Sequence, residues 1–215
     1  MNETRIIVLA KAPLPGLAKT RLIPALGAEG AAVLARRMLE TTLEHALRAQ
    51  VGPVELRVTP AIGDSAWRDI PIPDGVGISS QGDGDLGARL ARATQRGLEL
   101  NAAVMLIGCD CPELDSTALR QAALTLRGVD AVMHPTADGG YALLGLRRFH
   151  PRLFSDIPWS TSSVAHKTIQ QLDALQWPLH VAATLNDIDE PADLRRLPAG
   201  WLPPSCGCDA LKSDS

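Results

Sequence analysis

Short apolar segments typical of strands alternate along this chain with longer segments of helical periodicity, and this alternation restricts the fold more than any other feature. Residues 4–10 predict a first strand, and the apolar run at residues 103–108 predicts a strand buried on both faces. Between them, Ala35, Leu39 and Leu43 recur every four residues, which predicts a helix over residues 27–50. The pattern is typical of βαβ units. It predicts an α/β protein with three layers, α/β/α, around a mainly parallel sheet.

The rest of the chain continues this alternation. Further strands are predicted at residues 54–59, 76–80, 129–134, 141–146 and 179–183. Further helices are predicted at residues 65–69, 86–100, 115–127, 162–176 and 191–197. A chain of 215 residues can enclose one sizeable core. We expect a single domain over residues 1–197 and a disordered tail, rich in Pro, Gly, Ser and Cys, over residues 198–215.

The composition argues against several classes of partner. The net charge of −3 gives no broad attraction to nucleic acid or to anionic membranes. Aromatic residues make up only 3% of the chain, too few for platforms that stack bases. No apolar run reaches the roughly 18 residues of a membrane span, and the N-terminus shows no signal-peptide pattern. We therefore expect a cytoplasmic domain of the size of an enzyme, which binds no nucleic acid.

A basic loop follows the first strand. Lys11, Lys19 and Arg21 lie within eleven residues, with no acidic residue between them. Ligands of open α/β sheets bind at the carboxyl ends of the strands, so this loop is placed to hold an anion such as a polyphosphate. Pro13 stiffens the loop, and Gly16 allows the backbone to approach a ligand. The alternative is a solvated loop that only links strand to helix. The loop lacks the glycine pattern of a Walker A motif.

Two acidic positions are candidate metal ligands. Asp110 follows the buried strand at residues 103–108, where a carboxylate can hold Mg²⁺ or Mn²⁺ against a phosphate. Asp189, in the acidic run at residues 186–190, could complete the site. The alternatives are that Asp110 caps the helix after it and that Asp189 caps the helix that begins at Pro191.

Other polar motifs lie at predicted strand and helix ends. Gly84 and Asp85 open a helix, where Asp85 either binds a base or ribose or simply caps the helix. Asp138 precedes two glycines in a predicted tight turn, and Trp159 either stacks on a ligand or packs in the core. No G-x-S-x-G elbow is present, and no G-x-G-x-x-G follows the first strand, which argues against a hydrolase triad and a NAD-binding domain.

The four cysteines form two C-x-C pairs, Cys109 with Cys111 and Cys206 with Cys208. Without a secretory signal, we expect reduced thiols. Zinc sites usually use pairs with a wider spacing, so a structural zinc site is the weaker interpretation. The pair in the tail is a candidate thiol site for a soft ion.

Six motifs in order carry a family resemblance: K-A-P-x-P-G-x-x-K-T-R-L, Q-G-x-G-D-L-G-x-R-L, G-x-D-x-P-x-L, D-G-G-Y-x-L-L-G-L, I-x-W-S-T and D-I-D-x-P-x-D-L. The resemblance that they carry extends over about residues 5–197. The chain resembles the DUF2064 family, which is related to glycosyltransferases assigned to arsenosugar biosynthesis. The resemblance implies a GT-A fold, the Rossmann-like fold of nucleotide-diphospho-sugar transferases. It also implies distant similarity to guanylyltransferases of cofactor synthesis.

The resemblance also implies roles for individual residues. The nucleotide's phosphates would be held by the first motif, through Lys11, Pro13, Gly16, Lys19 and Arg21. The base or ribose would be contacted by Gln81, Gly84 and Asp85. Asp110 would be the metal aspartate; no second aspartate lies two positions on, so Asp189 is the candidate second ligand. The sugar or acceptor would be faced by Asp138, Gly139, Gly140, Trp159, Ser160 and Thr161.

These observations predict a metal-dependent glycosyltransferase that uses Mg²⁺ or Mn²⁺ and moves a sugar from a nucleotide-sugar donor to a small-molecule acceptor. Lys19 and Arg21 would stabilise the charge on the leaving nucleoside diphosphate. Asp138 would act as the base in an inverting reaction. The first alternative is a nucleotidyltransferase that uses an NTP and a phosphorylated acceptor and releases pyrophosphate. The second is a non-catalytic nucleotide-binding module.

Overall fold

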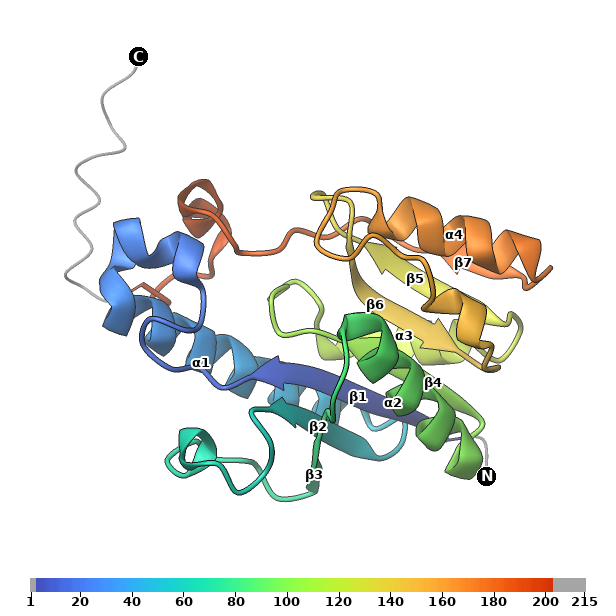
Figure 1. The fold of residues 1–215 in the computed structure, drawn as a ribbon, viewed down its shortest axis with the longest axis horizontal. Coiled ribbons are helices and arrows are strands. Elements are labelled where there is room, and N and C mark those ends of the chain that lie inside the picture. Colours follow the sequence, from blue (N-terminus) through green and yellow to red (C-terminus); the bar gives the residue numbers. More distant parts are fainter. Residues whose placement is uncertain (1–2, 203–215) are drawn as a thin grey trace, which may run out of the picture.

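A seven-stranded sheet forms the centre of the protein, whose computed structural model describes residues 3–202 (Figure 1). The strands are β1 (Thr4–Lys11), β2 (Val54–Thr59), β3 (Val76–Ser80), β4 (Ala103–Ile107), β5 (Ala131–Pro135), β6 (Tyr141–Leu146) and β7 (Leu179–Val181). Their spatial order is β3-β2-β1-β4-β6-β5-β7. β6 pairs antiparallel with both neighbours, and the other pairings are parallel. The mainly parallel sheet predicted from the sequence is confirmed.

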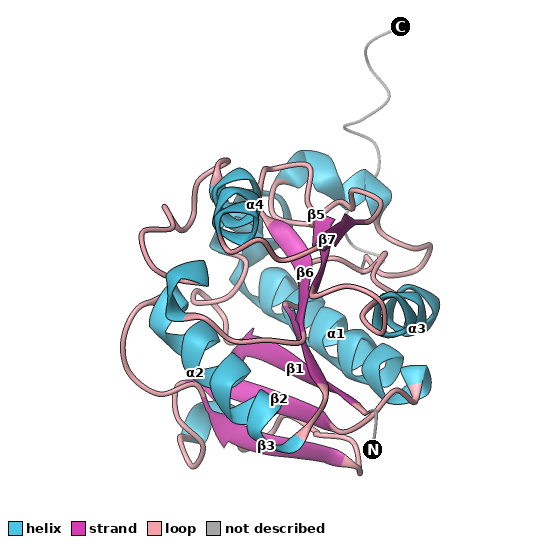
Figure 2. Ribbon diagram, turned by 90° about the vertical axis from the view of Figure 1, so that its right-hand side faces the viewer, coloured by secondary structure: helices cyan, strands magenta, loops and turns pink. Residues whose placement is uncertain are grey.

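Helices cover both faces of this sheet, as Figure 2 shows. α1 (Ile23–Ala49) and α3 (Ser116–Thr125) lie side by side on one face, and α2 (Leu86–Leu100) and α4 (Val164–Ala174) lie on the other. Four short 3₁₀ helices complete the described part of the chain: η1 (Thr20–Leu22), η2 (Ser65–Trp67), η3 (Pro151–Leu153) and η4 (Pro191–Arg196). The predicted three-layer α/β/α architecture is therefore confirmed.

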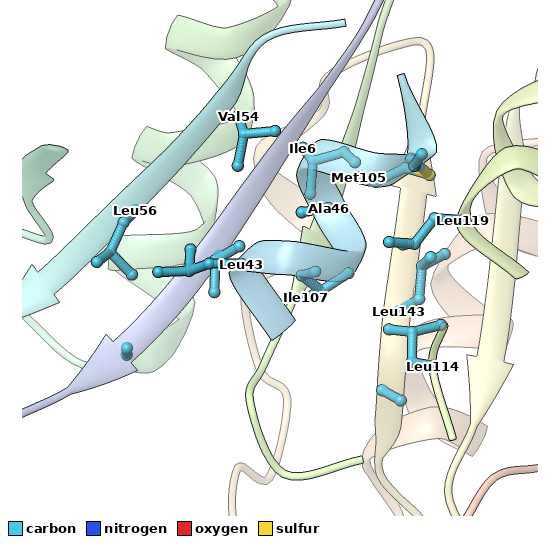
Figure 3. Packing of buried hydrophobic residues seen from close by; sticks show 14 of the residues in the cluster. Ile6, Leu43, Ala46, Val54, Leu56, Met105, Ile107, Leu114, Leu119 and Leu143 are labelled. Carbon is cyan, nitrogen blue, oxygen red and sulfur yellow. The ribbon is translucent and has the colours of Figure 1, made fainter. Parts of the chain in front are cut away.

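The core forms because successive side chains of the central strands point to opposite faces. In β1, Ile6 belongs to the cluster that includes residues of α1 and α3, whereas Ile7 belongs to the cluster that includes residues of α2 and α4, and both are fully buried. Figure 3 shows the first cluster, in which Ile6, Leu43 of α1 and Leu119 of α3 meet. Burying such a side chain contributes about 1.5–3 kcal/mol. The packing fixes β1 and β4, and hence the loops that leave their carboxyl ends.

Most element boundaries agree with the sequence prediction within two residues, and the differences have local causes. α1 begins at Ile23 instead of residue 27. Gly27 takes a positive φ of 71° inside α1 and separates a short first segment from the main helix, and the sequence predicted only the main helix. The last predicted helix is the 3₁₀ helix η4. We expected β5 to begin at residue 129, but it begins at Ala131.

The segment after β7 returns to the first part of the chain. Figure 1 shows η4 next to the beginning of α1. Ile188 is 1% exposed and packs in a third cluster with Leu22 and Met38, and the Arg37 guanidinium lies over the ring of Trp201. The folded part thus includes Trp201, which the sequence had placed in the tail. No helix among residues 3–202 is long and apolar enough to cross a membrane.

Candidate functional site

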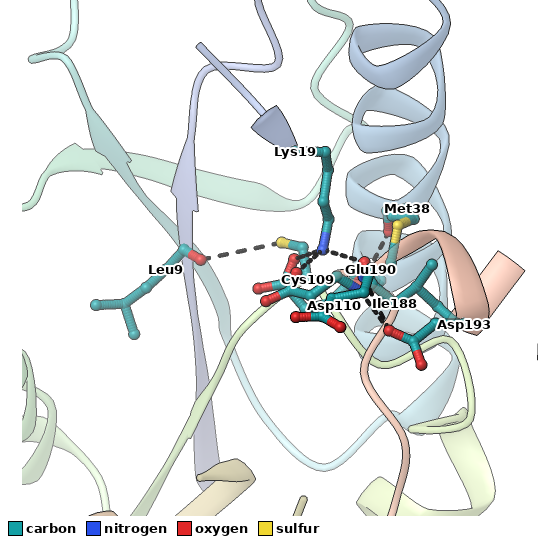
Figure 4. A network of polar contacts seen from close by, with 10 residues as sticks. Leu9, Lys19, Met38, Cys109, Asp110, Ile188, Glu190 and Asp193 are labelled. Carbon is teal, nitrogen blue, oxygen red and sulfur yellow. Dashed lines mark hydrogen bonds and ion pairs between the residues drawn. The ribbon is translucent and has the colours of Figure 1, made fainter. Parts of the chain in front are cut away.

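Lys19 lies at the centre of a polar network at the carboxyl edge of the sheet (Figure 4). Its ammonium group forms ion pairs with Asp110 and Asp189 and donates a hydrogen bond to the Ile188 carbonyl oxygen. The distances from Nζ to Asp189 Oδ1 and to the Ile188 oxygen are both 2.7 Å. Only 7% of the Lys19 side chain is exposed. A buried cation needs such partners, so the network joins the loop after β1, the end of β4 and the C-terminal segment.

The two carboxylates keep Lys19 charged. Burial by itself lowers the pKa of Lys19, but the charges of Asp110 and Asp189 and their hydrogen bonds outweigh burial and hold the pKa above its ordinary value. The carboxylates are more accessible than the lysine, since 56% of the Asp110 side chain and 39% of the Asp189 side chain are exposed. Both can therefore also meet a ligand.

Backbone contacts and apolar packing fix the relative positions of these two aspartates. The Ile188 amide donates a hydrogen bond of 2.9 Å to the carbonyl oxygen of Asp110. The Ile188 side chain is anchored in the cluster with Leu22 and Met38. Asp189, the next residue, is thereby held opposite Asp110. The expected convergence of Asp110 and Asp189 at one edge is what the structure shows.

Neither aspartate caps a helix. Asp115 is the N-cap of α3, and its side chain accepts hydrogen bonds from the amides of Thr117 and Ala118. Glu190 is the N-cap of η4 and forms a capping box with Asp193. The interpretations of Asp110 and Asp189 as caps are therefore wrong, and both carboxylates are left to the network around Lys19.

Two cavities lie at this edge and share Leu9, Arg21, Asp110 and Asp189 in their walls. The first cavity has a volume of about 280 Å³. Its other lining residues come from β1, the basic loop, α1 and the segment after β4: Ala10, Lys11, Leu17, Ala18, Lys19, Thr20, Ala35, Met38, Leu39 and Cys109. The second cavity has a volume of about 570 Å³ and lies toward β6 and α4. Asp110 and Asp189 form the boundary between them.

The first cavity collects the cations of the basic loop, Lys11, Lys19 and Arg21. Lys11 and Arg21 are exposed, and their side chains form no ion pair or hydrogen bond with any residue in the 3–202 range. Pro13 and Gly16 belong to the same loop but do not line either cavity; Gly16 takes a left-handed conformation (φ 75°) at its turn. Lys11 and Arg21 are thus available to an anion, whereas Lys19 is already paired.

The second cavity is acidic. Asp138 and Asp187 line it together with Asp110 and Asp189, and among the described residues Arg21 is the only Lys or Arg in its wall. Burial, and then the nearby charge of Asp138, raise the pKa of Asp187 above its usual value. Asp187 was missed as a site residue in the sequence, although it lies in the acidic run that supplied Asp189.

Asp138 begins the turn between β5 and β6, as predicted. Its Oδ1 accepts hydrogen bonds from the Thr136 hydroxyl (2.5 Å) and the Gly140 amide (2.9 Å), which hold the carboxylate in one orientation. Gly139 has φ 91°, and a Cβ atom there would overlap the backbone of Ser162. The turn therefore needs glycine at this position, and it packs directly against the loop before α4.

The loop before α4 supplies the remaining wall of the second cavity through Trp159, Ser160 and Thr161. Trp159 also packs against the cluster under α2 and α4 and lies against Gly87. Both interpretations of Trp159, ligand stacking and core packing, are thus compatible with its position. Gly140 lines this cavity as well, and Gly139 does not.

The loop before α2 does not line either cavity. Gln81 is 5% exposed, and its side-chain amide donates hydrogen bonds of 3.0 Å to the carbonyl oxygens of Ala10 and Arg57. Asp85 caps α2 by accepting a hydrogen bond from the Ala88 amide, which confirms the capping interpretation. Gly84 takes a left-handed conformation (φ 95°). Gln81 thus secures the ends of β1 and β2, beside the first cavity.

The donor set at the boundary fits a hard divalent cation bound together with phosphate. Two carboxylates, Asp110 and Asp189, already converge on one positive charge, the Lys19 ammonium. Among residues 3–202, no group of three or more His, Cys, Asp or Glu side chains is placed to hold a metal alone. Mg²⁺ is commonly bound by one or two carboxylates plus substrate phosphates and water, so this set is sufficient.

The thiols at the end of β4 do not add to this donor set. Burial and the charge of Asp110 raise the pKa of Cys109 and of Cys111 above the ordinary thiol value, and hard cations such as Mg²⁺ prefer oxygen ligands. The other predicted pair, Cys206 and Cys208, lies outside the residues that the structure describes.

Three of the solved structures that are similar to this chain differ in their sequence identity and in their similarity of fold. A protein from Desulfovibrio desulfuricans G20, provisionally described as a nucleotide-diphospho-sugar transferase, is 28% identical with a TM-score of 0.82, and the match covers 88% of this chain and 84% of that one. Rv0371c of Mycobacterium tuberculosis H37Rv, in a complex with manganese, is 20% identical with a TM-score of 0.51, covering 91% and 97%. A CMP:2-keto-3-deoxy-manno-octonic acid synthetase complexed with CTP is 12% identical with a TM-score of 0.57, covering 90% and 96%.

These similarities confirm the predicted fold, that of the nucleotide-diphospho-sugar transferases. No protein of curated function matches the sequence. Residues 42–161, more than half of the 215 in the chain, match the family described as an uncharacterized protein conserved in bacteria, DUF2064. The chain belongs to the DUF2064 family.

Proposed function

We propose that this protein is a metal-dependent glycosyltransferase that moves a sugar from a nucleotide-sugar donor to a small-molecule acceptor. One observation carries the proposal: a cationic cavity and an acidic cavity meet at Asp110 and Asp189. In a donor of this kind, an anionic diphosphate joins the nucleoside to the sugar, so the diphosphate and the sugar lie side by side in one molecule. The protein from Desulfovibrio desulfuricans G20, named for such a transferase, supports the same assignment.

The first cavity would bind the diphosphate. Lys11 and Arg21 are exposed and unpaired within the described part of the chain, so both can contact phosphate oxygens. Asp110 and Asp189 would hold Mg²⁺ or Mn²⁺, which, when bound, stabilises negative charge on the leaving nucleoside diphosphate. Arg21 lines both cavities and would therefore stay close to the bond that breaks.

The second cavity would hold the sugar and the acceptor. Trp159 offers an apolar surface for a sugar ring, and Asp138 is held by two hydrogen bonds at the cavity wall. In an inverting reaction, the Asp138 carboxylate would accept the proton of the attacking hydroxyl. The charge of Asp138 raises the pKa of Asp187, so the two carboxylates interact, and Asp187 is the second carboxylate available for this step.

The rival function is nucleotidyl transfer from an NTP to a phosphorylated acceptor, with release of pyrophosphate. The synthetase complexed with CTP shows that a protein of this fold can bind a nucleoside triphosphate. A phosphorylated acceptor would have to enter the second cavity, where Asp138 and Asp187 face one arginine once Asp110 and Asp189 are paired with Lys19 or the metal. This charge balance favours an uncharged acceptor and hence glycosyl transfer.

The test begins with a thermal-shift screen of nucleoside triphosphates, diphosphates and nucleotide sugars in the presence of Mn²⁺, since a ligand of the folded state raises its stability. The best stabiliser is then incubated with candidate acceptors. Nucleoside diphosphate released from a sugar donor supports the proposal, and pyrophosphate released from a triphosphate supports the rival. A non-catalytic module would be stabilised by a nucleotide without turning it over. In that case, Asp110→Asn would leave the transferase activity of cell extracts that contain the protein unchanged.

A further inference from the structure

We infer that Lys19 is a tethered cation that competes with the metal for Asp110 and Asp189, so that metal and diphosphate bind cooperatively. The inference rests on the proposed function, because it concerns the same carboxylates. The Lys19 ammonium already occupies the position between them, in ion pairs with both. A divalent cation that took the same oxygens would meet this positive charge at very short range.

Lys19 cannot simply withdraw into solvent. Its side chain is 7% exposed, and its ammonium group contacts three partners, the two aspartates and the Ile188 carbonyl oxygen. An ammonium separated from both carboxylates at this depth would be a buried, unpaired charge. Metal binding in the absence of another anion therefore carries an unfavourable contribution from Lys19.

A diphosphate in the first cavity removes that contribution. Lys19 lines this cavity together with the exposed Lys11 and Arg21, so a phosphate bound there lies within reach of its flexible four-carbon side chain. Lys19 can then exchange carboxylates for phosphate oxygens while Asp110 and Asp189 pass to the metal. Because coupling is reciprocal, the metal strengthens diphosphate binding by the same factor.

The structure also allows a simpler role, in which Lys19 only ties the loop after β1 to the C-terminal segment. Both roles predict a less stable protein when Lys19 is replaced. They differ in the affinity for a metal alone. Competition predicts that removal of the ammonium strengthens metal binding, because two carboxylates then face each other without a counter-ion. A purely structural role predicts weaker or unchanged binding, because the carboxylates lose their fixed positions.

The experiment measures Mn²⁺ binding to the full chain by calorimetry and by the electron paramagnetic resonance signal of free Mn²⁺. Lys19→Met is compared with wild type, and Lys167→Met, a lysine on α4 that lines neither cavity, is the matched control. We expect Lys19→Met to bind Mn²⁺ alone about 10-fold more tightly than wild type, a factor that corresponds to about 1.4 kcal/mol. We expect Lys167→Met to equal wild type.

A measurement on the wild type keeps the inference testable even where Lys19→Met is poorly folded. Inorganic pyrophosphate serves as the probe, because it carries the diphosphate without a base or sugar. Wild type saturated with Mn²⁺ should bind pyrophosphate at least 10-fold more tightly than metal-free wild type does. Mn²⁺ binding without this coupling, or with no gain in Lys19→Met, overturns the inference alone. No Mn²⁺ binding by either protein, with or without pyrophosphate, overturns the proposed function as well.

Discussion

The first and second cavities share a boundary at Asp110, yet they carry opposite charge. The first cavity is lined by the loop after the parallel strand β1, which supplies Lys11, Lys19 and Arg21. The second cavity is lined by the hairpin turn between β5 and β6, which supplies Asp138, and by the segment after β7, which supplies Asp187. The antiparallel strand β6 is the reason for this difference, because it brings a tight turn to an edge otherwise made of strand ends. Under the proposed function, the comparison gives separate places to the diphosphate of the donor and to its sugar with the acceptor.

The largest expected effect comes from the boundary itself. Asp110→Asn removes one of the two carboxylates that would hold the metal and should reduce turnover on the order of 10³-fold, equivalent to about 4 kcal/mol of transition-state stabilisation. Steady-state kinetics with the donor found in the screen measure this change. Asp74→Asn is the matched control, since Asp74 is exposed and lies in neither cavity wall. Equal turnover in the two variants would remove Asp110 from the reaction.

A change in the hairpin turn should disturb the second cavity and leave the first intact. Gly139→Ala places a Cβ atom against the Ser162 backbone at a left-handed φ of 91°, and we expect a loss of about 3 kcal/mol in the free energy of unfolding. Urea denaturation measures it. Gly128→Ala is the control, because its Cβ atom would meet nothing nearer than 3.8 Å. A variant as stable as the control would show that the turn is not rigid.

The cationic side is tested by Arg21→Ala. Loss of a charge-assisted hydrogen bond to phosphate should weaken donor binding by about 1.5–3 kcal/mol, roughly 10- to 150-fold. Calorimetry with the donor measures the affinity, and Arg68→Ala, an exposed arginine outside both cavity walls, should bind as wild type does. An unchanged donor affinity in Arg21→Ala, or a loss confined to acceptor binding, would contradict the proposed contact between Arg21 and the diphosphate.

The smallest effect is expected on the acidic side. Because the folded state raises the pKa of Asp187, it binds the proton more tightly than the unfolded chain does, and stability falls as the pH rises through that pKa. Asp187→Asn removes this penalty and should stabilise the protein at pH 7 by less than about 0.5 kcal/mol, since solvent screens a half-buried group. Thermal unfolding from pH 3 to pH 8 measures it. The gain should vanish at the acidic end; a gain that is independent of pH would contradict the electrostatic cause.

The fold was predictable because local patterns determine most of it. The apolar run of β4 reflects a strand that is buried on both faces of the sheet. The four-residue spacing in α1 reflects a helix that is buried on one face. The strand order was not predictable in the same way, because the insertion of β6 between β4 and β5 depends on the packing of the whole sheet. Asp110 was recognisable from its place after a buried strand.

The pairing of Lys19 was not predictable, for a reason that is also physical. The lysine lies in a loop that otherwise supplies exposed cations, and nothing near it in the sequence is acidic. Its partners come from β4 and from a segment that is positioned by Ile188 in an apolar cluster. A pattern read along the chain does not show which segment returns to which loop, so Lys19 was expected to be free for phosphate.

The ion pair between Lys19 and Asp189 spans 170 residues of sequence, nearly the whole described chain. During synthesis from the N-terminus, the sheet from β1 to β6 can begin to form well before Asp189 has left the ribosome. Contacts of such sequence separation form late and slowly. The network around Lys19 is therefore complete only when almost all of the chain has been made and folded. A truncated product would carry the cationic loop without Asp189, and the proposed function predicts that such a product has no activity.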